Sequence, residues 1–203
     1  MATTVKIFVS GEEQATVQQQ VQVIEKYDNF LLAQVSPSEL KKIKDAFLVE
    51  DITPQYRIDI GLNNIDTNKP RVGSHGLAKP HPAYSGAAEK QLNAGKHHYL
   101  VQFIGPVKKT WLGKLKKAGA ELRAPYADFT YVVRCTDKII RLIAAIPVVR
   151  WTGHLPYEAR IETVLQAKTK GTVARGLKPL PRTRLLAGIY TIEFFGEADT
   201  IKA

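Results

Sequence analysis

The 203-residue sequence lacks the features that mark several protein classes. Its single cysteine excludes a disulfide scaffold, and its 14 glycines and 11 prolines exclude collagen-like and low-complexity chains. No apolar run approaches the roughly 20 residues that cross a bilayer. The start Met1-Ala-Thr-Thr lacks the basic and apolar regions of a signal peptide. With 44% hydrophobic residues, the sequence predicts a packed core and no membrane partner.

Acidic residues are also scarce, with 19 against 29 basic residues, which gives a net charge of +10. Residues 1–61 hold 6 basic and 9 acidic residues (net −3), whereas residues 97–162 hold 11 and 5 (net +6). Residues 62–96 and 163–203 are net +3 and +4. A basic chain suggests nucleic-acid binding, but here the charge differs between segments.

The chain contains an internal repeat. Residues 27–36 match residues 126–135 at a constant offset of 99, which also pairs Leu40 with Ile139 and Val49 with Val148. Residues 5–11 correspond to residues 99–105, each an extended apolar run closed by glycine. Residues 190–196 repeat that pattern a third time. The repeat predicts two copies of one unit and the first strand of a third.

The second copy predicts strands at 99–104, 120–124, 129–135 and 148–152. Apolar residues at helical spacing predict one helix over 107–117, opened by Pro106 and ended by Gly119, and another that begins after Thr136. The order is β-α-β-β-α-β, which is the split βαβ order of the ferredoxin-like fold. In that α+β fold, two helices cover one face of a four-stranded antiparallel sheet and the other face is free.

The first copy predicts the same order, with strands at 5–9, 21–25, 30–35 and 48–53 and helices at 12–20 and after Ser36. Ser36-Pro37-Ser38-Glu39 has the residues of a capping box. The domain prediction is therefore unit one at 1–61, an irregular connector at 62–96, unit two at 97–162, and an extended tail at 163–203 with the partial third unit.

Catalytic and cofactor motifs are absent from the sequence. It contains no HExxH, GxSxG, P-loop or GxGxxG pattern, so we expect no enzyme activity and no cofactor. Adjacent His97 and His98 would point to opposite faces of a strand, which argues against a metal site. Cys135 is predicted to be a half-buried thiol.

An RNA-binding RRM module has the same element order, so nucleic-acid binding is an alternative. The third strand of the second copy places Phe129 and Tyr131 on one face, but it lacks the glycine and the basic lead-in of the RRM pattern. The predicted helix carries the lysines, which are interpreted as its solvated side: Lys108, Lys109, Lys114, Lys116 and Lys117.

Four stretches carry a family resemblance. They are Tyr99-Leu-Val-Gln-Phe-Ile-Gly-Pro, then Trp111-Leu-Gly-Lys-Leu-Lys-Lys-Ala-Gly-Ala120, then Tyr126 with Phe129-Thr-Tyr-Val-Val-Arg134, then Ile146-Pro-Val-Val-Arg-Trp151-Thr-Gly-His-Leu-Pro-Tyr157. This pattern resembles the N-terminal pro-regions of bacterial subtilisin-like (S8 family) serine proteases, over residues 4–62 and 97–162. The chain departs from the family in having two units and the start of a third, and in lacking the catalytic Asp, His and Ser motifs.

The resemblance implies an intramolecular chaperone and inhibitor, secreted with its protease as part of a zymogen. Such a module docks the free face of its sheet on the protease and places a following segment in the active-site cleft. Which connector would enter the cleft, 62–96 or 163–187, is open. The resemblance also leaves a non-inhibitory interaction module as an alternative. The candidate protease-facing residues are Phe129, Tyr131, Trp151, His154, Pro156 and Tyr157.

The orphan strand at the end of the chain makes a separate prediction. Residues 190–195, which begin at Tyr190 and end at Phe195, have no following helix or partner strand of their own. An unpaired strand edge is a template for pairing with another chain. The sequence therefore predicts self-association through this strand.

Overall fold

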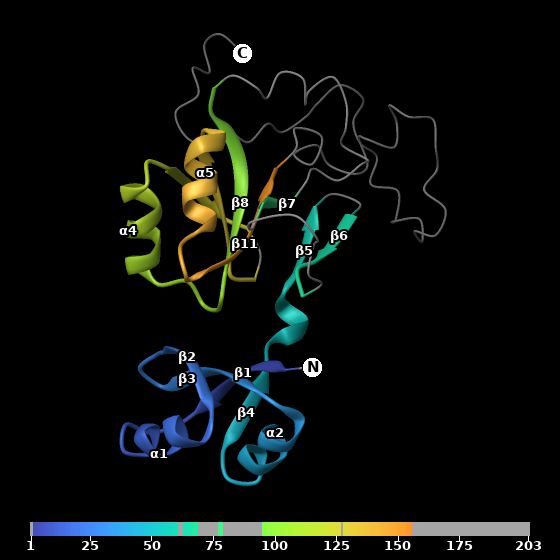
Figure 1. The fold of residues 1–203 in the computed structure, drawn as a ribbon, viewed down its shortest axis with the longest axis vertical. Helices are drawn as coiled ribbons and strands as arrows, with labels where there is room; N and C mark the ends of the chain where they lie inside the picture. The colour runs from blue at the N-terminus through green and yellow to red at the C-terminus, as the bar shows by residue number, and fades with distance from the viewer. Residues whose placement is uncertain (1, 61–62, 69–76, 79–94, 127, 156–203) are drawn as a thin grey trace, which may run out of the picture. The chain divides into compact units, whose positions relative to one another are not determined.

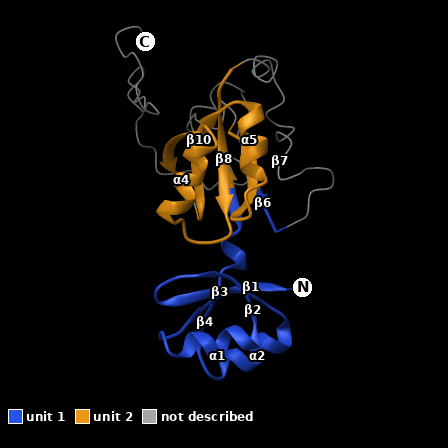
Figure 2. Cartoon of the chain, turned by 60° about the vertical axis from the view of Figure 1, so that its left-hand side comes forward, with its two compact units in different colours: residues 1–58, 65–70 blue, residues 59–64, 71–203 orange. Residues whose placement is uncertain are grey.

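A computed structural model describes residues 2–60, 63–68, 77–78, 95–126 and 128–155. The chain divides into two compact units (Figure 2), one of residues 1–58 and 65–70 and one of residues 59–64 and 71–203. Both units mix helices with mainly antiparallel sheet, so the predicted α+β class is confirmed.

The first unit contains a four-stranded antiparallel sheet in the order β2-β3-β1-β4. Its elements are β1 (Thr3–Phe8), α1 (Glu13–Gln20), β2 (Gln22–Lys26), β3 (Phe30–Val35), α2 (Pro37–Lys44) and β4 (Leu48–Asp51). A short 3-10 turn, η1 (Thr53–Gln55), and a two-stranded hairpin of β5 (Arg57–Ile60) and β6 (Asn63–Asp66) follow.

The core of the first unit lies between the sheet and its two helices, which cover the same face (Figure 1). Val5 and Ile7 alternate along β1 toward that face and pack with Val17 of α1 and Ile43 of α2. The capping box predicted at Ser36 is confirmed, because its hydroxyl accepts from the Glu39 backbone N–H and the Glu39 carboxylate accepts from the Ser36 N–H.

The second unit contains a sheet in the order β7-β11-β8-β10-β9, in which only the two-residue β7 pairs in parallel. Its elements are β7 (Leu77–Ala78), β8 (His97–Phe103), α4 (Lys109–Lys117), β9 (Glu121–Pro125), β10 (Thr130–Cys135), α5 (Asp137–Ala144) and β11 (Val149–His154). Without β7, the strands stand in the same order as in the first unit: fourth, first, third, second.

The core of the second unit is built in the same way, with α4 and α5 on one side of β8 (Figure 1). The Trp111 ring stacks on Phe103 with ring centroids 5.5 Å apart. Ile140 and Ile143 of α5 are fully buried, and the Thr136 hydroxyl caps that helix as predicted. Gly119 follows α4 with φ of +97°, which glycine adopts without steric cost.

Two local predictions were wrong. Pro106 does not open a helix, because α4 begins at Lys109 after an extended Lys108. The range 62–96 is not wholly irregular, since β6 and β7 fall within it. The predicted third-unit strand at 190–195 lies outside the described residues.

The hairpin between the second and third strands is one residue longer in the second unit than in the first. In the first unit the Tyr27 backbone N–H donates to the carbonyl of Phe30, three residues on. In the second unit the Tyr126 N–H donates to Thr130, four residues on, and Phe129 has φ of +56°. The repeat offset is therefore 99 before this turn and 100 after it, as the N-caps Ser36 and Thr136 also show.

Candidate protein-docking face

Strand pairing defines two faces of the second sheet. Contacts with the helices mark one of them, because Phe103 stacks on Trp111 of α4 and the Tyr99 hydroxyl donates to Asp137 of α5. Side chains alternate along a strand, so their neighbours lie on the other face, here called the helix-free face. Its residues are His98, Leu100, Gln102, Glu121, Arg123, Thr130, Val132, Arg134, Trp151 and Gly153.

The structure does not bring the predicted docking residues onto one face. Trp151 pairs with Gln102 and lies on the helix-free face. Tyr131 pairs with Val101, and His154 pairs with Tyr99, which places both on the helix-covered face. Tyr131 and His154 therefore do not share a face with Trp151.

The other predicted docking residues do not lie on a sheet face that the structure describes. Phe129 lies in the hairpin before β10 rather than in a strand. Pro156 and Tyr157 are outside the described residues.

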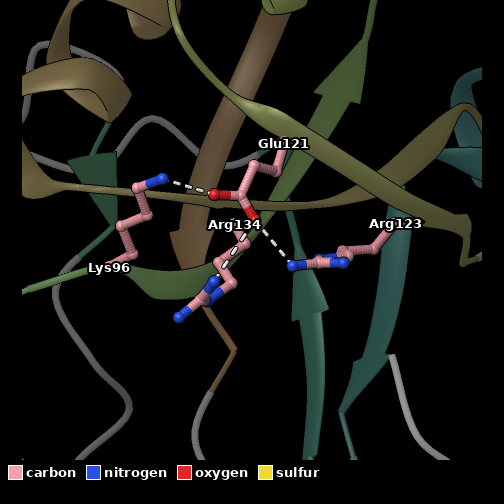
Figure 3. A network of polar contacts seen from close by, with 4 residues as sticks. All are labelled: Lys96, Glu121, Arg123 and Arg134. Carbon is pink, nitrogen blue, oxygen red and sulfur yellow. Dashed lines mark hydrogen bonds and ion pairs between the residues drawn. The ribbon is translucent and has the colours of Figure 1, made fainter. Parts of the chain in front are cut away.

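A polar network occupies the helix-free face near the edge strand β9 (Figure 3). Oε1 of the Glu121 carboxylate accepts a hydrogen bond from Lys96 Nζ. Oε2 accepts from Arg123 Nη2, with a distance of 2.6 Å, and from Arg134 Nη1, with a distance of 3.3 Å. Three cations thus share one carboxylate, which leaves this part of the face with two excess positive charges. The buried Arg123 Nε has no hydrogen-bond partner among the described residues. Lys96 and Arg134 are 45% and 40% exposed, so they are the members of the network that could donate to acceptors of a partner.

Sequence reasoning missed this network. Lys96, Glu121, Arg123 and Arg134 come from three separate segments, which the pairing of β10 with both β8 and β9 brings together. The available signal was the i, i+2 spacing of Glu121 and Arg123 in a predicted strand, which places both on one face.

The cations lower the pKa of Glu121, chiefly through the hydrogen bond from Lys96 and then that from Arg134. A carboxylate whose pKa is lowered in the folded state stabilises the fold at pH values above its unfolded pKa, about 4.3. That contribution is lost as the pH falls through the folded pKa. We expect Glu121→Gln to reduce the free energy of unfolding near neutral pH by about 0–1 kcal/mol.

The pH dependence provides the check on this prediction. Urea unfolding at several pH values should show the difference between wild type and Glu121→Gln shrinking below about pH 4. Glu12→Gln removes the same charge from an exposed site of the first unit and serves as the control. A difference that persists unchanged at pH 3 would contradict an electrostatic origin.

A second set of polar side chains lies on the helix-covered face. Cys135 is fully buried rather than half-buried, and burial, with the nearby Asp137 carboxylate, raises the pKa of its thiol to about 12. His97 is 5% exposed, and neither of its ring nitrogens has a hydrogen-bond partner among the described residues. The His154 ring lies at 6.2 Å from it. A thiol with a raised pKa is a poor nucleophile, so this set does not form a Cys-His catalytic pair.

No group of three or more His, Cys, Asp or Glu side chains among the described residues is placed to hold a metal ion. Among the helices of the described part of the chain, none has the length and apolarity to cross a membrane.

The first sheet also carries charged and aromatic residues on its helix-free face. Lys6 Nζ donates to Glu50 at 2.9 Å and lies 5.8 Å from the centroid of the Phe30 ring. Phe30 contacts Phe8 and stacks on Tyr27, with ring centroids 5.8 and 4.2 Å apart. The charges of Lys6 and Glu50 cancel one another, so this pair has no net charge. The Glu121 network, in contrast, has an excess of positive charge.

One family model matches part of the chain. Residues 61–156 match a family model described as "Domain of unknown function (DUF8729)". The match covers 96 residues (156 − 61 + 1), just under half of the chain, and includes every strand of the second sheet. No curated protein and no solved structure matches the chain.

Proposed function

We propose that this chain is a non-catalytic pro-region module of a subtilisin-like serine protease, built from two tandem ferredoxin-like units. The observation that carries the proposal is the shared strand order of the two units, fourth-first-third-second, with both helices on one face. That order supports the ferredoxin-like assignment of each unit. The module would dock through the part of the helix-free face around Glu121 and Arg134, because Leu100, Gln102, Thr130 and Val132 in the middle of that face are buried within the chain.

The chemistry of that face supports a protein partner. Arginine is enriched at protein interfaces, and its planar guanidinium binds carboxylates in bidentate geometry. Arg123, Arg134 and Trp151 lie on the same face of the sheet, where strand β8 separates Trp151 on β11 from the arginines on β10 and β9. We therefore expect the protease surface that docks here to present carboxylates or backbone carbonyls to the two arginines. Binding of the native protease by such a surface would also favour its folding.

The proposal places the module with its protease in a secreted zymogen. It assigns no catalytic residue and no cofactor to this chain. A module of the same fold that binds a protein without inhibiting it is the alternative within this class.

The test uses the full chain and purified subtilisin as the probe. We expect slow, tight inhibition of peptide hydrolysis or faster refolding of denatured subtilisin. Arg123→Gln with Arg134→Gln should weaken either effect at least tenfold, because removing charged partners from an interface costs about 2–5 kcal/mol. Lys41→Gln with Lys42→Gln removes the same charge from α2 and should leave both effects unchanged.

Two outcomes would contradict the proposal. The first is that the wild-type chain alters neither hydrolysis nor refolding of any subtilisin-like protease tested. The second is that the two double variants weaken the effect equally, which would assign it to net charge rather than to this face. Binding without inhibition would favour the alternative.

A further inference from the structure

The outward side of α4 carries a cluster of lysines without acidic residues. The exposed residues are Lys109, Lys114, Lys116 and Lys117. The two buried residues of α4, Trp111 and Leu115, lie on the opposite side of the helix and pack in the core. No Asp or Glu occurs between residues 106 and 120. The four exposed side chains, here called the lysine face, form no ion pair with any described residue.

Helix stability does not account for the lysine face. Cations in the last turn of a helix interact favourably with its dipole, which would explain the three lysines near its end. However, Lys109 stands at the positive N-terminal end, and the first turn has no acidic residue. The neighbouring Lys108 lies over the Trp111 ring, 5.8 Å from its centroid, but no described residue balances the charge of Lys109. The positive charge at this end of the helix therefore calls for another explanation.

A glycine lies within the lysine face, and no contact with the described residues requires a glycine there. Gly113 follows Lys109 by four residues and precedes Lys117 by four, so the three lie on one side of the helix. A Cβ at this position would meet no atom within 4 Å. Glycine in a helix interior is less stable than alanine, so Gly113 weakens α4 without relieving a contact among the described residues. It leaves the backbone accessible between the lysines.

The composition of the lysine face indicates the chemistry of its partner. Protein interfaces are depleted in lysine and enriched in arginine and aromatic residues, and the four exposed residues include neither. The apolar side of α4 is buried, so the helix cannot insert into a lipid surface. Lysine ammonium groups contact phosphates as point charges, without reading base sequence.

We propose that the lysine face of α4, with Gly113 between its lysines, binds the phosphate backbone of nucleic acid without sequence preference. This inference goes beyond the proposed function and uses a different surface. The helix-free face is on the opposite side of the sheet from α4, so the two activities can be separated by mutation.

The test measures binding of the full chain to a fluorescent 20-base-pair DNA duplex at several salt concentrations. Each lysine that neutralises a phosphate contributes about 0.9 to the slope of log affinity against log salt. The variant Lys109→Gln/Lys116→Gln/Lys117→Gln should therefore lower the magnitude of that slope by about 2–3. Lys41→Gln/Lys42→Gln/Lys44→Gln in α2 removes the same charge and should leave the slope unchanged.

Two further measurements define the site. Gly113→Ala should raise the midpoint of thermal unfolding by about 2–6 °C, and Gly113→Glu should weaken DNA binding at least as much as one lysine removal. A second duplex of unrelated sequence should give the same affinity and slope.

Several results would overturn the proposal. They are equal slopes for the two triple variants, a strong sequence preference, and binding to phosphatidylserine vesicles without binding to DNA. Because subtilisin inhibition depends on the helix-free face, the α4 triple variant should retain it. A wild-type chain that does not bind DNA would overturn this proposal and would leave the proposed function standing.

Discussion

Gly153→Ala is expected to destabilise the second unit by about 2–3 kcal/mol, the cost of inserting a group into a packed site. A Cβ at this position would lie 2.1 Å from Cη2 and 2.5 Å from Cζ2 of the Trp151 ring. No real Cβ contact is that short, so the ring or the strand must move. Trp151 is 8% exposed, which leaves the ring little room to rotate away without opening the helix-free face.

The two tryptophans make the measurement selective. Trp111 and Trp151 both belong to the second unit, so urea unfolding followed by tryptophan fluorescence reports on that unit. Gly113→Ala is the matched control, because its new Cβ meets no atom within 4 Å. That control should be neutral or stabilising.

A double-mutant cycle assigns the cost to the ring. In a Trp151→Leu background, with Trp111 as the remaining reporter, Gly153→Ala should cost less than about 0.5 kcal/mol, since the colliding atoms are gone. A full cost of about 2 kcal/mol in that background would show that the destabilisation does not come from Trp151.

Phe129→Gly is expected to be more stable than Phe129→Ala by about 1–2 kcal/mol. Phe129 has φ of +56°, a left-handed conformation that places the Cβ of an L-residue too close to the neighbouring carbonyl oxygen. Both substitutions remove the ring and its packing, so their difference isolates the backbone. Glycine adopts this φ without penalty, whereas alanine has the same penalty as phenylalanine.

The matched pair in the first unit tests the reason for that difference. Phe30 follows the shorter hairpin and is the first residue of β3, with no positive φ. Phe30→Gly should there be less stable than Phe30→Ala by about 0.5–1 kcal/mol, because glycine weakens a strand. The same sign at both positions, measured by urea unfolding, would contradict a left-handed Phe129.

Much of each unit could be predicted from local sequence. The Ser36 capping box and the Thr136 N-cap mark helix starts, and period-two and helical periodicities separate strands from helices. The order of elements follows from those signals. Pro106 misled the prediction because proline is also accommodated in an extended approach to a helix, and here the chain stays extended through Lys108.

The repeat itself determined that the chain holds two similar units, since the same order of apolar runs occurs twice. It did not determine which face each residue of β10 occupies. One extra residue in the hairpin, absorbed by the left-handed Phe129, moves Tyr131 to the helix-covered face. A sequence alignment at constant offset does not reveal an insertion of one residue. The face that Tyr131 occupies depends on its pairing with Val101, which the alignment does not contain.

The surface chemistry divides in the same way. The basic charge of the second half follows from the sequence alone. So does the placement of the lysines on α4, because they lie in one continuous helical segment. Only the tertiary structure decided that Lys96, Arg123 and Arg134 share the Glu121 carboxylate and that Trp151 lies over Gly153. The physical reason is that helix faces follow from spacing along the chain, whereas sheet faces depend on which strands pair and in which register.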